Sequence, residues 1–219
     1  MNAGLGKTAP SVQSDGLSKG ERTRNRLLDL AYEAVIRKGF AATSIEELVE
    51  AAGITKSGFF YHFRDKNDLA RQILERYGAE NEVFLETLSR RARELSDDPL
   101  HSYLIFLKLL AEALSDLAVH HPGCLVAIIT FQDQAFDREV WALNTDGVLA
   151  WRRRFRDWVE AIALAYPPRT PVDLDALADN ALMYVYGGAM LSKALSAPEM
   201  LGRQVLFYRD GVRLMFAPG

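Results

Sequence analysis

The stretch over residues 43–66 constrains the fold of this chain more than any other. It opens on a capping signal, because Thr43 and Ser44 are each followed three residues later by a glutamate, and its apolar residues then recur at helical spacing. Gly53 ends this first helix, since glycine adopts the left-handed backbone of a helix terminus at least cost. A second short helix follows over residues 56–63. The stretch therefore predicts a helix-turn-helix, a motif whose second helix enters the major groove of DNA.

Further residues give this motif a specific likeness. They are Thr43-Ser44, Ala51-Ala52-Gly53-Ile54-Thr55, Phe59-Phe60-Tyr61-His62-Phe63, Lys66 and Asp68-Leu69. Together they resemble the DNA-binding region of the TetR family of bacterial transcriptional repressors, closely over residues 21–70 and beyond that only as a pattern of helices. The resemblance implies that a DNA operator is contacted by Ser44, Lys56, Ser57, Gly58, Tyr61, His62 and Lys66. Thr55, the expected N-cap of the second helix, joins these DNA-binding candidates.

Residue chemistry supports part of this set. The Lys56 ammonium can donate to guanine or to a phosphate, and Tyr61 is the aromatic residue expected to face outward. The residues expected in the core beneath the helix are Phe59, Phe60 and Phe63. Two positions depart from the family, because Phe60 stands where a phosphate-binding tyrosine is usual and Gly58 has no side chain to read a base. Arg22 or Arg26 is a further candidate for a phosphate contact, with an ordinary solvated charge as the alternative.

The distribution of charge agrees with DNA binding at one end only. The whole chain has 26 basic and 29 acidic residues and a net charge of −3, which argues against a nonspecific nucleic-acid binder. Residues 19–66 nevertheless hold nine basic and seven acidic residues, a net charge of +2, whereas residues 67–219 carry −5. The acidic remainder would be repelled by phosphates.

The rest of the chain is predicted to be helical throughout. Apolar residues at helical spacing, interrupted by proline and glycine, predict helices over residues 19–38, 65–95, 100–119, 124–131, 137–166, 173–196 and from 198 onward. With the two helices of the motif, this gives an all-α fold of nine helices without a sheet. The expected divisions are a disordered arm over residues 1–18, a DNA-binding domain over 19–66 and an effector-binding and dimerisation domain over 67–219. Whether the arm contacts DNA stays open.

Several other classes of protein are disfavoured. No nucleophile elbow, P-loop or dinucleotide-binding glycine motif is present, so an enzyme is not expected. His120-His121 cannot ligate one metal from one helix face, and neither a metal nor a cofactor is expected. Cys124, the only cysteine, is either an electrophile sensor or a small packed residue. No apolar run is long enough to span a membrane and no signal peptide is evident, which favours the cytoplasm.

The second domain is expected to hold a ligand and to dimerise. The aromatic residues that could line a mostly apolar pocket are Tyr103, Phe106, Phe131, Trp151, Phe155, Trp158 and Tyr184, although a plain core is the alternative for each. The residues predicted at a homodimer interface are Gly187, Gly188, Leu191, Val205, Tyr208 and Val212. The glycines would permit close packing of helices.

These features predict a dimeric repressor that a small, mostly apolar ligand releases from a pseudo-palindromic operator. The long helix after the motif would carry the ligand's effect to the DNA-reading helices. An activator or a ligand-independent regulator with the same DNA-binding head is the alternative. A helical enzyme or adaptor that does not bind DNA is the rival from another class.

Overall fold

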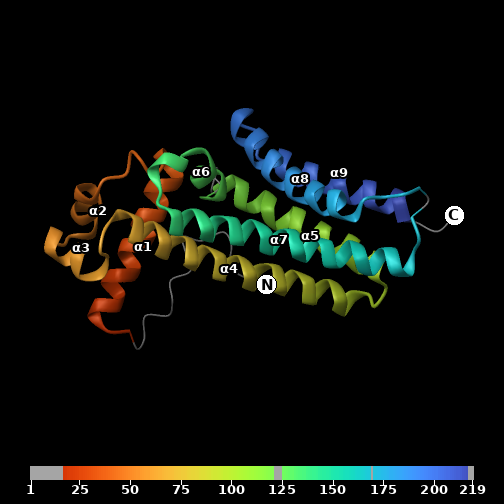
Figure 1. The fold of residues 1–219 in the computed structure, drawn as a ribbon, viewed down its shortest axis with the longest axis horizontal. Coiled ribbons are helices and arrows are strands. Elements are labelled where there is room, and N and C mark those ends of the chain that lie inside the picture. Colours follow the sequence, from red (N-terminus) through yellow and green to blue (C-terminus); the bar gives the residue numbers. More distant parts are fainter. Residues whose placement is uncertain (1–16, 121–124, 169, 217–219) are drawn as a thin grey trace. The chain divides into compact units, whose positions relative to one another are not determined.

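A computed structural model describes residues 17–120, 125–168 and 170–216 of the chain. These residues form nine α-helices and no strand, which confirms the predicted all-α fold (Figure 1). The helices are α1 (Lys19–Lys38), α2 (Ile45–Ala52), α3 (Lys56–His62), α4 (Lys66–Leu95), α5 (Pro99–His120), α6 (Leu125–Phe131), α7 (Arg138–Ala165), α8 (Leu174–Ala194) and α9 (Glu199–Phe216). A short 3-10 helix over Asp133–Ala135, which the sequence did not predict, joins α6 to α7.

The helix ends follow the capping signals of the sequence. Ser18 closes a capping box at the start of α1, because its Oγ accepts the Glu21 backbone N–H at 3.2 Å while the Glu21 carboxylate accepts the Ser18 N–H at 2.8 Å. Asp173 caps α8 through its carboxylate, which accepts the backbone N–H groups of Asp175 and Ala176. α4 runs through Gly78 without a break and continues as one helix to Leu95.

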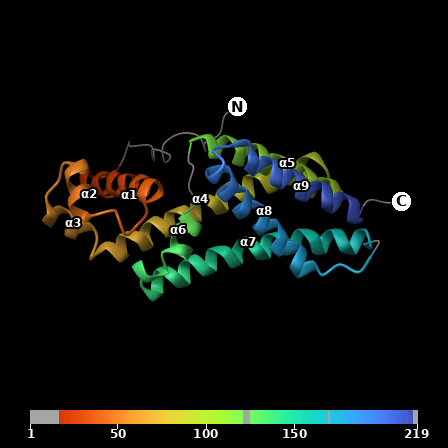
Figure 2. The same cartoon turned by 90° about the horizontal axis from the view of Figure 1, so that it is seen from above.

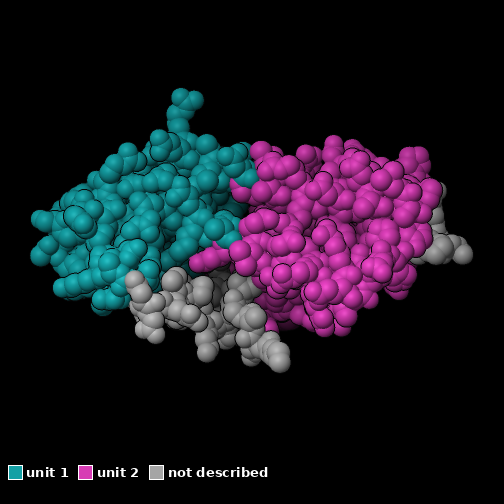
Figure 3. Space-filling model, turned by 90° about the horizontal axis from the view of Figure 1, so that it is seen from below, with its two compact units in different colours: residues 1–79, 123–146 teal, residues 80–122, 147–219 magenta. Residues whose placement is uncertain are grey.

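The chain divides into two compact units, which Figure 3 colours separately. Unit 1 comprises residues 1–79 and 123–146, and unit 2 comprises residues 80–122 and 147–219. α4 and α7 therefore each supply residues to both units. This grouping places α6 and the first turns of α4 and α7 with the three N-terminal helices.

Unit 1 is built on a core that joins α1 to the helix-turn-helix. Leu27, Leu28 and Ala31 of α1 are buried together with Phe59 and residues from the beginning of α4. α2 packs on α1 and on α3, and α6 also packs against α1. α3 is only seven residues long, so this shared core rather than helix propensity fixes its position.

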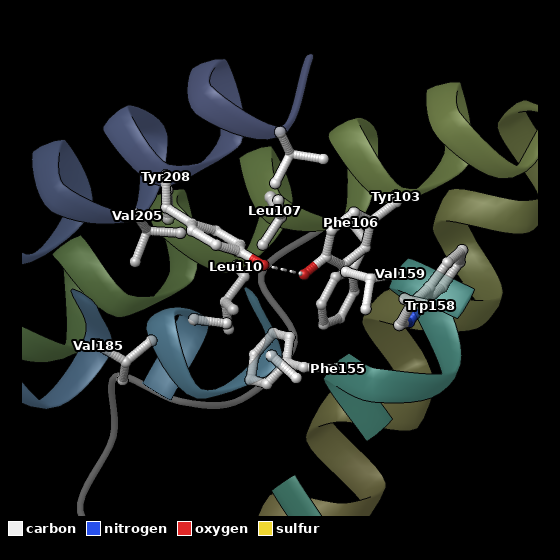
Figure 4. Packing of buried hydrophobic residues seen from close by; sticks show 14 of the residues in the cluster. Tyr103, Phe106, Leu107, Leu110, Phe155, Trp158, Val159, Val185, Val205 and Tyr208 are labelled. Carbon is white, nitrogen blue, oxygen red and sulfur yellow. Dashed lines mark hydrogen bonds between the residues drawn. The ribbon is translucent and has the colours of Figure 1, made fainter. Parts of the chain in front are cut away.

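Unit 2 is a helical bundle in which α9 lies alongside α5 and α8 (Figures 1 and 2). Tyr103, Phe106 and Phe155 are fully buried at its centre. The Tyr103 and Tyr208 hydroxyls lie 3.2 Å apart, as drawn in Figure 4, and the Tyr208 hydroxyl donates to the Leu177 carbonyl at 3.0 Å. Burial raises the pKa of both phenols above the usual value, so each stays protonated and keeps this chain of hydrogen bonds.

The crossing of α5 and α9 depends on Gly202. A Cβ atom at this position would lie 2.0 Å from Ser115 Oγ and 3.0 Å from the Ala111 carbonyl oxygen. A side chain there would force the Ser115 hydroxyl to move and would press on the Ala111 carbonyl. Within the part of the chain that the structure describes, no helix is long and apolar enough to cross a membrane.

Candidate nucleic-acid interface

α2 and α3 form the two helices of the predicted motif. Ser44 caps α2 by accepting the Glu47 N–H at 3.2 Å, and Thr55 caps α3 by accepting the Gly58 N–H at 3.1 Å. Gly53 ends α2 at φ 67°, a left-handed conformation that other residues rarely adopt. The candidate hydroxyls of Ser44 and Thr55 are thus already engaged as acceptors, although each can still donate to a phosphate.

The aromatic residues of α3 divide between the core and the surface. Phe59 is fully buried and Phe63, which ends the helix, is 1% exposed, as predicted. Tyr61 is 82% exposed, so the predicted outward side chain does face solvent. The expectation that Phe60 is buried was wrong, because its side chain is 47% exposed. Residue 60 lies about 100° around the helix from Phe59, and in this seven-residue helix that rotation leaves the Phe60 ring half outside the core that holds Phe59.

Lys56 begins α3 and is paired with a residue of α2. Its Nζ lies 2.7 Å from the Glu46 carboxylate, and both side chains are more than half exposed. The hydrogen bond from Lys56 lowers the pKa of Glu46, so this carboxylate is ionised at neutral pH. A DNA phosphate or a guanine would therefore compete with Glu46 for the lysine.

Lys66 has a different environment from the one its sequence suggested. Its Nζ donates to the Phe40 carbonyl at 2.6 Å and lies 4.3 Å from the centre of the Phe40 ring. Burial, and then the charge of Lys38, lower the pKa of this half-buried amine. Lys66 thus ties the start of α4 to the turn between α1 and α2. A phosphate contact would use its remaining donors.

The other DNA-binding candidates surround α3. Ser57 is exposed, and Gly58 and His62 are half-buried. Burial, and then the charge of Arg24, lower the pKa of His62, so its imidazole is neutral at pH 7 and can donate one hydrogen bond.

The arginines of α1 are partly engaged with the backbone. Arg22 donates to the Leu17 carbonyl at 2.6 Å and Arg26 donates to the Ala51 carbonyl at 3.2 Å. A guanidinium has five N–H donors, so these contacts leave donors for a phosphate.

Gln132 is a residue that the sequence analysis missed. Its Oε1 accepts the backbone N–H of Phe40 at 3.0 Å and that of Ala41 at 3.5 Å. A Cβ atom at Gly39, whose φ is 85°, would lie 2.5 Å from the Gln132 amide nitrogen. The turn after α6 therefore fits closely against the turn that precedes α2. In the sequence, Gln132 is a single polar residue after an apolar helix, and nothing beside it indicates this contact.

The predicted pocket residues are brought together only in part. The ring of Trp158 stacks on those of Tyr103 and Phe106, with ring centres 5.5 Å and 5.7 Å apart. The centre of the Phe155 ring lies 6.2 Å from that of Phe106 and 6.1 Å from that of Trp151. These side chains pack against one another and fill the core shown in Figure 4. Tyr184 lies elsewhere in unit 2, beside Phe207 and Tyr208. Phe131 belongs to unit 1, where it is 79% exposed, and does not join the cluster.

The predicted interface residues also need correction. Four of them are buried inside unit 2 of the same chain and therefore cannot contact a second subunit, namely Gly188, Val205, Tyr208 and Val212. A Cβ at Gly188 would lie 3.1 Å from Leu201 of α9, which shows that this glycine serves packing within one chain. Gly187 faces open space and Leu191 is exposed, so these two remain candidates.

The described residues contain no group of three side chains that could hold a metal ion. Cys124, His121, the side chain of His120 and residues 1–16 of the arm lie outside what the structure describes. The expectations for these positions therefore stay predictions.

Comparisons with known proteins match this geometry. Residues 27–73 match the family model of the bacterial regulatory proteins of the tetR family. The HTH-type transcriptional regulator AcrR of Shigella flexneri is 37% identical over 57 residues, about a quarter of each chain. The transcriptional regulator AcuR of Cereibacter sphaeroides is 24% identical over 204 residues, which cover 90% of this chain and 91% of the relative.

A solved structure resembles the whole fold. The transcriptional regulator of the TetR family from Agrobacterium tumefaciens superposes with a TM-score of 0.74 at 18% identity, over 90% of this chain and 100% of that one. At this identity the likeness establishes the arrangement of helices.

Proposed function

Because the chain is a DNA-binding transcriptional regulator of the TetR family, and not an enzyme, we propose that it is a dimeric repressor released from a pseudo-palindromic operator by a small ligand. The observation that carries this proposal is the two-sided construction of α3. Phe59 and Phe63 anchor the helix in the core of unit 1, while Tyr61 and Lys56 project from it into solvent. A short helix held in this way can present its outer face to a major groove.

The proposed contacts divide into two kinds. Lys56 and Tyr61 would reach base edges or thymine methyl groups, and Ser57 and Gly58 would bring the start of α3 close to the DNA. Ser44, Thr55 and His62 would bind phosphates and so set the position of the protein on the duplex. The net charge of +2 over residues 19–66 favours contact of this region with DNA, whereas the acidic remainder of the chain would be repelled by the phosphates.

We propose that two subunits meet through α8 and α9. These helices and the C-cap of α8 carry exposed apolar side chains, namely Met183, Met190, Leu191, Leu195, Phe207 and Leu214. A two-fold axis through this surface would bury it against itself, and the operator of such a dimer would carry two half-sites related by the same symmetry. Such half-sites lie about 34 Å apart, one turn of DNA, or a similar spacing.

Release by a ligand requires a path between the two units. α4 is one helix from Lys66 to Leu95 and supplies residues to both units, which supports the proposal that it carries the ligand's effect. The contacts of Lys66 and Gln132 with Phe40 give movements of α4 and α6 a direct way to reach the helix-turn-helix. The ligand need only bind the released state more tightly than the DNA-bound state.

One observation favours a second candidate, a regulator that does not respond to a ligand. The predicted pocket residues Tyr103, Phe106 and Phe155 are fully buried and pack on one another, so they leave no space for a ligand among themselves. A thermal-shift screen of small molecules separates the candidates, because a ligand that binds the folded protein raises its unfolding temperature.

The experiment for the proposed function is selection of bound duplexes from random DNA, with the mass of the complex measured in solution. We expect a pseudo-palindromic consensus bound by a dimer, with affinity that falls steeply as salt increases. Binding without sequence preference, or by a monomer, would contradict the proposal.

A further inference from the structure

A cavity of about 600 Å³ opens in unit 2, at the end of the bundle where α4 turns into α5 and faces α7. This volume lies within the range typical of small-molecule sites. Ala150, Ala161 and Pro99 give it an apolar wall, and the remaining lining is polar. It differs from the pocket that the sequence predicted, because Trp158 is the only aromatic residue of that prediction among its lining residues.

Trp158 contributes an unpaired hydrogen-bond donor. Its side chain is 6% exposed, and no acceptor among the described residues lies within hydrogen-bond distance of its indole Nε1. An indole N–H can only donate, so its partner must supply an oxygen or another acceptor. Figure 4 shows the ring at the edge of the drawn cluster, with Tyr103 and Phe106 on one side of it.

Two arginines that line the same cavity are available to a ligand. The Arg93 guanidinium lies 4.7 Å from the centre of the Trp158 ring, which holds it by a cation–π contact. Arg153 also lines the cavity, and among the described residues neither arginine forms an ion pair. Arg154, by contrast, is neutralised because it pairs with Glu82 and, at 3.1 Å, with Glu86.

The acidic lining residues limit the charge of a ligand. Asp97 and Asp157 are exposed and line the same cavity, where they would repel a second negative charge. Two available arginines against two available carboxylates leave the site with little net charge. A single carboxylate placed between the arginines and the indole is therefore favoured over a dicarboxylate or a phosphate.

We propose that this cavity binds a small organic monocarboxylic acid, whose carboxylate accepts hydrogen bonds from Trp158 Nε1, Arg93 and Arg153. The carbon skeleton lies against Ala150, Pro99 and Ala161. The inference rests on the proposed function in one respect, since it names the class of ligand that would release the repressor. It replaces the mostly apolar ligand expected from the sequence with an amphiphilic anion.

The test is a titration of the full-length protein, without DNA, followed by the indole N–H resonances of its three tryptophans. The Trp158 resonance is assigned as the one missing from Trp158→Phe. Benzoate is the probe, benzamide is the uncharged control with the same skeleton, and inorganic phosphate is the control for anions in general. We expect benzoate to shift the Trp158 resonance downfield in a saturable manner, while benzamide and phosphate do not.

Variants make the result specific. Arg93→Gln and Arg153→Gln are each expected to weaken benzoate binding by about tenfold, the loss typical of one charged hydrogen bond. Arg90→Gln removes an exposed arginine of α4 outside the cavity and is expected to bind benzoate as the wild type does. Binding that is unchanged in both cavity variants, or the absence of any saturable shift with benzoate, would overturn the proposal.

The two proposals fail separately in this experiment. A protein that shows no operator preference but binds benzoate at Trp158 would contradict the proposed function and leave the site standing. A protein that binds its operator but gives no response at Trp158 would overturn the site alone. If both stand, benzoate should weaken operator binding by the wild type more than by Arg153→Gln.

Discussion

Gln132 accepts the backbone N–H of Phe40 at 3.0 Å, across 92 residues of sequence. The bond joins the turn after α6 to the turn before the helix-turn-helix, inside one compact unit. The Phe40 carbonyl also accepts a hydrogen bond from Lys66 Nζ. One short turn is thus held both by α4 and by the segment that follows α6.

Gln132→Ala should weaken unit 1, because it leaves the Phe40 N–H without its acceptor. We expect the free energy of unfolding to fall by about 1–2 kcal/mol, measured by urea denaturation. Gln132→Glu keeps an acceptor oxygen and should retain most of the stability. Equal losses in the two variants would show that the hydrogen bond is not the cause.

Gly202→Ala should weaken unit 2 by crowding the contact between α5 and α9. The new Cβ would displace Ser115 Oγ and press on the Ala111 carbonyl, so we expect a loss of about 1–3 kcal/mol in thermal or urea unfolding. Gly147→Ala is the matched control, since a Cβ at this exposed position of α7 meets nothing within 4 Å. This control should be neutral or gain up to about 1 kcal/mol from helix propensity. A stable Gly202→Ala would contradict the close crossing.

Asp68 should make stability depend on acid pH. Burial alone would raise the pKa of its carboxyl, but the Arg64 N–H at 3.0 Å and the side chains of Arg71 and Gln72 outweigh burial and lower the pKa. A lowered pKa contributes stability above the unfolded value of about 3.9, and that stability is lost as the pH falls through the folded pKa.

The measurement is the free energy of unfolding from neutral pH down to the acid range. Asp68→Asn should be less stable at neutral pH and should lose less on acidification than the wild type. Asp116→Asn, at an exposed position of α5, is the control and should follow the wild type. Parallel curves for the wild type and Asp68→Asn would contradict the assignment.

The order and limits of the helices could be predicted because they depend on local signals. The caps at Ser44, Thr55 and Asp173 and the glycines 39 and 53 are each readable within a few residues. The outward position of Tyr61 was also predicted, and its side chain is 82% exposed. Local rules therefore determined most of the helix-turn-helix.

The missed features depend on contacts between distant segments. Lys66 reads as a surface cation, yet Phe40 engages it from 26 residues away, and nothing near Gln132 in sequence points to its role. Val205 and Val212 are apolar positions of an amphipathic helix, a pattern that does not distinguish a core from a subunit interface. The prediction that Phe60 is buried was wrong because a continuous aromatic run has no period that separates core positions from surface positions.

Glu46→Gln should strengthen binding to DNA in general, because it removes the carboxylate that holds Lys56 at 2.7 Å. Affinities for the operator and for unrelated DNA are measured by fluorescence anisotropy at two salt concentrations. Glu50→Gln makes the same change of charge on α2 without touching Lys56 and should have the smaller effect. Equal gains in the two variants would attribute the result to net charge alone.

The most direct test of the account is an operator titration with Lys56→Ala and Tyr61→Ala. Each substitution should weaken specific binding by about tenfold or more, because a base contact typically discriminates by about 1–3 kcal/mol. Lys108→Ala is the matched control, since Lys108 is also exposed and paired with a glutamate, at 3.6 Å, but belongs to unit 2. The account predicts that this control binds the operator as the wild type does. Undiminished specific binding by both α3 variants would contradict the assignment of α3 as the helix that reads DNA.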